Sequence, residues 1–262
     1  MAGNKRENES GSRLRALLSG FAAVLFWLAV WQIISMLVAQ ELLVPAPLVV
    51  AGTWVRLLGT AKFWQAAGLS LLRIVIGFAA AVLAGCVMAV LTARFRAVKV
   101  LFSPLLHVVR DAPVVSFIIL AMVWIHTDSI PSFIAFLMVM PIVWSNVEKG
   151  IQETDRDLLE MAQVYRFGWW KTLRAVRIPA VMPYLMAACT TGLGFAWKSG
   201  IAAEVLCRPA RSIGKYLQDA KLYLETPEVF AWTATVILLS ILLEKLLLAA
   251  VRRLGKRYNT GV

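Results

Sequence analysis

The sequence predicts an all-α membrane protein, a bundle of six transmembrane helices in one domain. Of its 262 residues, 60% are hydrophobic and 16% are charged, whereas soluble proteins contain about 45–50% apolar and about 25% charged residues. The mean hydropathy is +0.74, so the net charge of +12 must lie outside long uncharged stretches. These values exclude an ordinary soluble domain. They also exclude a nucleic-acid-binding protein, because no soluble scaffold is left to carry a basic face.

Six apolar stretches approach the roughly 20 residues that a membrane-spanning helix needs. They make up one transmembrane domain, 17–251, with spans at about 17–38, 68–91, 104–125, 130–146, 179–206 and 230–251. The first follows a basic head, 1–16. It is too long for a signal-peptide core and no small-residue cleavage site follows it, so we expect it to be retained. The third is interrupted at Asp111-Ala112-Pro113, because proline removes a backbone donor and disfavours helix in the preceding residue.

Small residues recur every four positions along the second span, at Gly77, Ala81, Gly85 and Ala89. Such a stripe lets another helix approach closely. Two interpretations are open, a seam between two copies of the chain and packing inside the bundle, and the second is favoured.

The distribution of lysine and arginine predicts the orientation, because cytoplasmic segments are enriched in both. Seventeen of these residues lie in the head, in 92–103, in 147–178 and in the tail 252–262, whereas six lie in the alternate connections. Both termini are therefore expected in the cytoplasm.

The longest connection, 147–178, has an acidic start and a basic second half, which predicts two short amphipathic helices joined by a turn near Arg166 to Gly168. One interpretation places it on the inner leaflet, with Trp169 and Trp170 among the headgroups. The other is a segment that docks onto a partner protein.

The same connection carries a recognisable motif. Glu160, Ala162, Val176, Ile178 and Pro179 match the register of Glu-Ala-Ala, three residues, Gly, nine residues, Ile-x-Leu-Pro. Two positions differ: Met161 replaces an alanine, and Arg166 stands where the glycine belongs, with Gly168 two residues later.

With this motif the sequence resembles the permease subunit of a binding-protein-dependent ABC importer. Pro45-Ala46-Pro47, Ser70-Leu71-Leu72-Arg73 with Gly77, and Trp197 to Glu204 are similar to the nitrate, sulfonate and taurine branch. The resemblance covers roughly 44–253.

The resemblance implies a type I importer permease in the inner membrane, paired with a second copy or a close relative, with the path of a small anion at their interface. Two cytoplasmic ATPase subunits would engage the coupling segment 147–178, and an extracytoplasmic binding protein would deliver the solute. The residues implied in coupling are Glu160, Ala162, Gly168, Ile178 and Pro179.

The chain itself is expected to be neither an enzyme nor a cofactor carrier, with ATP and Mg²⁺ used by the partner. Gly214-Lys215 is followed by Tyr216, and Gly255-Lys256 by Arg257, so neither supplies the Lys-Ser/Thr of a phosphate-binding loop.

Charged residues inside spans are costly and suggest function. Arg110 and Asp111 lie beside Pro113. They either line the solute path or, as favoured, cap a helix near the cytoplasmic surface. A metal site is not supported there, because His107 and Asp111 fall short of the three or four ligands needed.

Trp197, Lys198 and Glu204 are further candidates for the solute path. Lys198 and Glu204 are six residues apart and point in different directions on an unbroken helix, so separate contacts are expected.

The alternative function is an ion-gradient-driven secondary transporter, which would normally show internal repeats with paired broken helices. The sequence contains one such break, in the third span.

Overall fold

The computed structural model describes residues 3–258, with side chains from 21 to 250. Residues 1–2 of the predicted head and 259–262 of the predicted tail lie outside this range. Every regular element within it is helical, in agreement with the predicted all-α class. The elements are α1 (Gly3–Val38), α2 (Pro47–Leu58), α3 (Ala61–Arg94), α4 (Arg96–Asp111), α5 (Val114–Trp124), η1 (Thr127–Ser129), α6 (Ile130–Gln152), α7 (Arg156–Val164), α8 (Trp169–Thr172), η2 (Leu173–Arg177), α9 (Ile178–Cys207), α10 (Ile213–Leu222) and α11 (Thr226–Tyr258).

Five of the predicted spans are single stretches long and apolar enough to cross a membrane: Phe21–Val38, Ala61–Arg94, Thr127–Gln152, Trp169–Cys207 and Thr226–Ala250. Several begin or end beyond the predicted bounds, because polar terminal turns are stabilised by caps. The hydroxyl of Thr60, for example, accepts a hydrogen bond from the Phe63 amide at the start of α3.

The third predicted span, 104–125, is not one straight helix. α4 and α5 meet at an angle of 108°. The break falls at the predicted residues: Ala112, which precedes Pro113, has the extended conformation expected before proline, with ψ 141°. Helix also begins earlier than predicted, at Arg96. The described helices therefore supply a sixth crossing only where this bent pair counts as one span.

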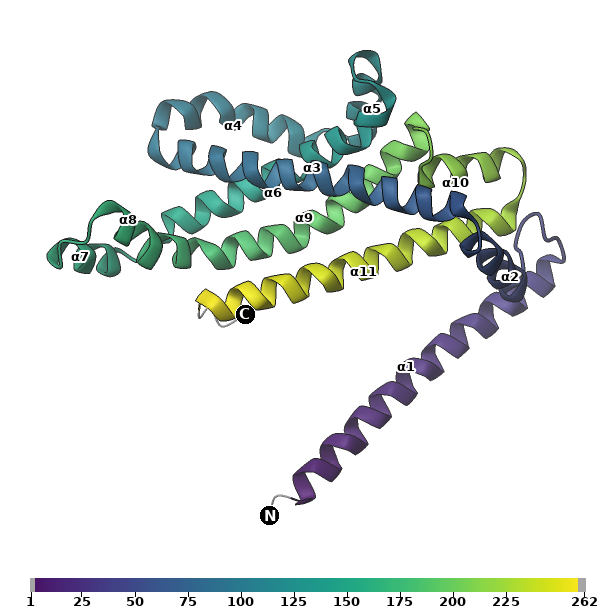
Figure 1. Cartoon of the computed structure of the whole chain (residues 1–262). Helices are drawn as coiled ribbons and strands as arrows, with labels where there is room; N and C mark the ends of the chain where they lie inside the picture. The colour runs from purple at the N-terminus through teal and green to yellow at the C-terminus, as the bar shows by residue number, and fades with distance from the viewer. Residues whose placement is uncertain (1–2, 259–262) are drawn as a thin grey trace.

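Figure 1 shows α7, α8 and the C-terminal end of α11 at one end of the bundle, with α2 and α10 at the other. The α3–α4 junction lies at the same end as α7 and α8. The segments with many basic residues thus share one end, which we call the basic end, as the lysine and arginine count predicts.

The centre of the bundle is formed by α3, α6 and α9, and the small-residue stripe of α3 lies against α6. A Cβ atom added to Gly77 would lie 2.1 Å from the Ser132 carbonyl oxygen, and one added to Gly85 would lie 2.8 Å from Val143 Cβ. No side chain fits at either distance. The stripe is therefore a packing surface within the chain, and the alternative of a seam between two copies is wrong.

α1 lies apart from the other helices (Figure 1), and none of its span Phe21–Val38 is buried. Among its described side chains, those near its C-terminal end contact the rest of the chain. Trp31 Nε1 donates to the Pro45 carbonyl at 3.1 Å, and its ring stacks on Phe230 with centroids 5.5 Å apart.

Candidate coupling segment and solute path

The coupling segment consists of α7, α8 and the π-helical turn η2, which leads into α9. Asp155 caps α7 by accepting a hydrogen bond from the Asp157 amide at 2.9 Å. The two short helices predicted here are confirmed, although α8 is a single turn that runs through η2 into α9. Ile178 and Pro179 are half-buried in the first turn of α9 and belong to this helix start.

α7 ends in a left-handed residue. Arg166 has φ 51°, its amide donates to the Gln163 carbonyl at 2.9 Å, and the Phe167 amide donates to the Ala162 carbonyl at 2.8 Å. This pair of bonds is the Schellman motif, which normally contains glycine at the position of Arg166. Gly168 has φ −64° and does not take over this role. The substitution of the motif glycine by arginine therefore keeps the turn at a conformational cost.

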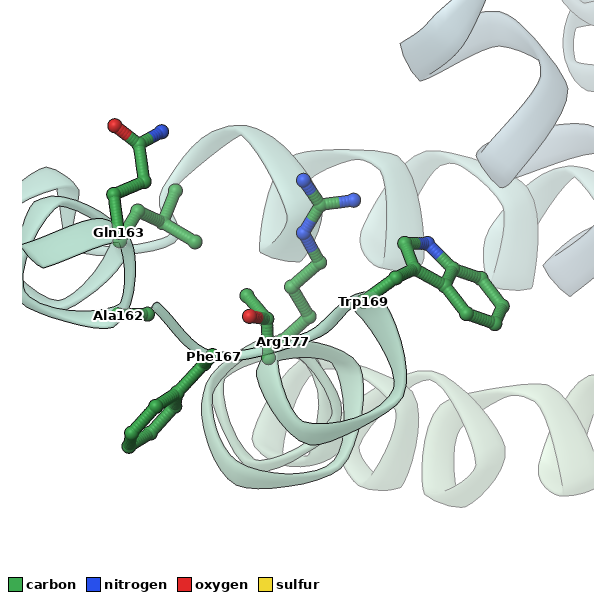
Figure 2. A pocket seen from close by; sticks show the side chains of 7 residues that line it. Ala162, Gln163, Phe167, Trp169 and Arg177 are labelled. Carbon is green, nitrogen blue, oxygen red and sulfur yellow. The ribbon is translucent and has the colours of Figure 1, made fainter. Parts of the chain in front are cut away.

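Ala162 faces the interior of the coupling segment. Its side chain is 2% exposed and lines a cavity of about 210 Å³ together with Phe167, Trp169 and Arg177. Figure 2 shows its methyl group directed toward the helical turn that carries Arg177. The packing of the coupling segment on itself therefore accounts for the small side chain at Ala162.

The exposed side of α7 lies opposite this cavity. Glu160 is exposed, and next to it lies an apolar surface that we call the α7 ridge. It consists of Leu158, Met161, Val164 and Tyr165. Met161, which departs from the motif alanine, is part of this ridge.

Arg110 and Asp111 lie at the break between α4 and α5. The Arg110 guanidinium donates to the Pro141 carbonyl at 3.3 Å and to Ser145 Oγ, both in the middle of α6. Asp111 is the last residue of α4, and α5 has no side-chain cap. Neither side chain caps the start of α5, as the favoured expectation would require. Both side chains are exposed.

The three candidates on α9 have different surroundings. Trp197 is 1% exposed, and its Nε1 donates to the Val236 carbonyl of α11 at 3.1 Å, so it is a packing residue and not part of a path. Lys198 is exposed. Glu204 is buried, and the helix between them is continuous. Lys198 and Glu204 thus do not contact each other, and of the two only Glu204 has a hydrogen-bond partner on a neighbouring span among the residues described.

Glu204 is the centre of a buried polar cluster at the end of the bundle that carries α10. Its Oε2 accepts hydrogen bonds from Ser70 Oγ at 2.7 Å and from the Gly214 amide at 3.2 Å. Ser70 Oγ in turn accepts from the Ile213 amide at 3.0 Å. The carboxylate thus lies at the N-terminus of α10, where the helix dipole favours a negative charge.

Arg73 connects this cluster to the α5–α6 connection. Its Nη1 lies 3.9 Å from Glu204 Oε1, and its Nη2 donates to Asp128 Oδ1 at 2.8 Å and to the Ala210 carbonyl at 3.1 Å. Sequence reasoning singled out Glu204 but gave no role to Ser70, Arg73 or Asp128. Two signals were available: the charge of Arg73 inside a predicted span, and the place of Ser70 and Arg73 in a segment that resembles the family.

Taken as a fold, this arrangement is that of the membrane-spanning part of an ABC transporter. It superposes on a chain of the structure described as "Crystal structure of an amino acid ABC transporter with histidines". The TM-score is 0.60, the sequence identity is 18%, and the superposition covers 73% of this chain and 94% of that chain. The profile of the binding-protein-dependent transport system inner membrane component matches residues 81–260. The chain belongs to this family. It is a permease of an ABC importer in the inner membrane, and the alternative of a secondary transporter is wrong.

Three relatives share most of the chain. The taurine transport system permease protein TauC of Escherichia coli is 27% identical over 251 residues, 93% of this chain and 90% of that protein. The bicarbonate transport system permease protein CmpB of Synechococcus elongatus is 28% identical over 221 residues, 79% of this chain and 78% of that protein. The nitrate import permease protein NrtB of the same organism is 27% identical over 220 residues, with 79% and 78% covered.

Proposed function

We propose that this permease forms the import path for a small anion, and that Arg110 and Lys198 attract the anion within the membrane. Taurine, bicarbonate and nitrate, named for its relatives, are small solutes with anionic groups. Both basic side chains are exposed on helices at membrane depth. Arg110 carries the proposal furthest, because it lies at the only break in a spanning element of the described chain and its anchor on α6 leaves part of the guanidinium free.

We further propose that two copies, or one copy and a close relative, form the path between them, with both termini in the cytoplasm. An extracytoplasmic binding protein then delivers the solute to the end that carries α2 and α10. Two ATPase subunits bind the basic end and supply ATP and Mg²⁺, with coupling through α7.

The α7 ridge supports the docking proposal. A row of exposed apolar side chains on one helix face fits the helix-in-groove mode of recognition, and Glu160 beside it can pair with a basic residue of the partner. The cavity is lined by the segment's own side chains, such as Leu159, Ala162 and Phe167.

Uptake of labelled taurine, bicarbonate and nitrate into proteoliposomes tests the path. The liposomes contain the permease, its ATPase and its binding protein. We expect ATP-dependent uptake of at least one anion, reduced about tenfold or more in Arg110→Ala and Lys198→Ala, because a lost charge interaction of about 1.4 kcal/mol changes a rate tenfold. The matched control is Arg96→Ala, an exposed arginine at the basic end. Uptake driven by an ion gradient without ATP would contradict the proposal, as would unchanged uptake in both variants.

Co-purification of the ATPase tests the docking surface. Met161→Asp places a charge in the α7 ridge and is expected to abolish capture, whereas Gln163→Asp, exposed on another side of α7, should leave it intact. The alternative, in which the segment lies on the inner leaflet, predicts the reverse: Trp169→Ala and Trp170→Ala lower activity and Met161→Asp does not. Undiminished capture with Met161→Asp would rule out the ridge as the docking element.

A further inference from the structure

A second and larger hollow lies at the basic end, between the bundle and the coupling segment. It has a volume of about 600 Å³, within the range of small-molecule sites. Its walls come from the ends of α3, α6 and α9, and are lined mainly by apolar side chains such as Val90, Val181 and Leu185. We call it the α3–α9 groove.

Two arginines lie at the rim of this groove. Arg94 is the last residue of α3, and Arg177 is the last residue of η2, directly before α9. Both guanidinium groups are exposed. Among the side chains from 21 to 250, none accepts a hydrogen bond from either group or forms an ion pair with it. The Arg94 guanidinium lies over the Phe95 ring, 5.7 Å from its centroid. Two positive charges that no carboxylate of the described side chains neutralises thus border an apolar hollow where spanning helices end.

The backbone places Arg177 and Trp169 at this rim. η2 is a π-helical turn, a rare irregularity that is frequent at functional sites. Figure 2 shows Arg177 and Trp169 beside each other, between α7 and the bundle. The groove opens where α3 and α6 end and α9 begins, and the ends of spanning helices lie at the level of the lipid headgroups.

We propose that the α3–α9 groove binds one anionic phospholipid, with its phosphate between Arg94 and Arg177 and an acyl chain along the apolar wall. Arginine pairs with phosphate through two parallel hydrogen bonds, and basic pockets between spanning helices bind anionic headgroups. The hydroxyl of Thr154 lines the wall but already donates to the Gly150 carbonyl at 3.2 Å, so a small hydrophilic anion gains little from this wall. A helix of a second copy would cover that wall but would leave both arginines without a counter-charge.

A bound lipid would also connect the bundle to the coupling segment, because Leu159, Trp169 and Leu173 line the same groove. The lipid site itself does not depend on the proposed solute or on ATPase docking. It can therefore be tested on the purified full-length permease alone.

The test is lipid retention measured by native mass spectrometry. The permease is purified with added dioleoyl phosphatidylglycerol or, in parallel, dioleoyl phosphatidylcholine. We expect one phosphatidylglycerol per chain to resist removal, and phosphatidylcholine to be lost. Replacement of both arginines, Arg94→Gln with Arg177→Gln, should weaken retention about 30-fold.

The matched control replaces two other exposed arginines of the basic end that lie outside the groove, Arg96→Gln with Arg174→Gln, and should retain the lipid. A second variant, Val181→Trp, fills the groove without changing its charge and should also release the lipid. Equal retention of both lipids would overturn the proposal. So would equal loss in the two double variants, or full retention in Val181→Trp.

Discussion

Removal of the Glu204 carboxylate should destabilise the permease strongly. Glu204→Ala leaves the Ser70 hydroxyl and the Gly214 amide without their acceptor and leaves Arg73 without its buried counter-charge. Each unsatisfied buried group costs about 1–3 kcal/mol, and a broken buried ion pair about 3–5 kcal/mol. Hydrogen bonds between membrane helices contribute only about 0.6 kcal/mol on average, so the total loss of stability is smaller than the sum of these costs. We expect a loss of about 3 kcal/mol.

The assay is thermal unfolding of the purified chain in detergent, followed by tryptophan fluorescence. A loss of about 3 kcal/mol corresponds to a fall in Tm of roughly 10 °C for a chain of this size. Glu204→Gln keeps an oxygen acceptor and loses only the charge near Arg73, which retains Asp128 and Ala210 as partners. The Tm of Glu204→Gln should therefore be only about 3 °C below that of the parent. Lys198→Ala, exposed on the same helix, serves as the control and should not change Tm. If Glu204→Ala melted within about 2 °C of the parent, the cluster would not be a structural clamp.

Two further predictions concern the α7 turn and the orientation of the chain. A left-handed conformation costs a residue other than glycine about 1–2 kcal/mol, and glycine adds about 0.5–1 kcal/mol of chain entropy. Arg166→Gly should therefore protect the Phe167 amide about threefold better in hydrogen exchange, while Gly168→Ala should be tolerated; unchanged or lower protection in Arg166→Gly would refute the assignment. For orientation, an impermeant maleimide should label Thr127→Cys in intact cells and Glu153→Cys only after permeabilisation, and the reverse pattern would invert the proposed topology.

The coupling segment shows how far local sequence patterns reach. The acidic start and Asp155 predict a helix, the basic half predicts a second one, and both are present. Whether Arg166 or Gly168 supplies the left-handed residue was open, because either position could close the turn. In the structure Arg166 is the left-handed residue, and two hydrogen bonds close the turn at the end of α7. The burial of Ala162 likewise depends on Phe167, Trp169 and Arg177 folding back over it.

The sequence by itself determined the membrane class, the spans, the break at Pro113 and the sharing of one end by the basic segments. These depend on length, hydropathy and local backbone chemistry. Only the tertiary structure decided that Trp197 is packed against α11, that Arg110 reaches the middle of α6, and that Glu204 meets Ser70, 134 residues away in the chain. The physical reason is that lipid tails and protein interiors are both apolar. Hydropathy therefore finds the helices but cannot tell which face of each contacts lipid, which contacts a neighbouring helix, and which distant polar groups meet between them.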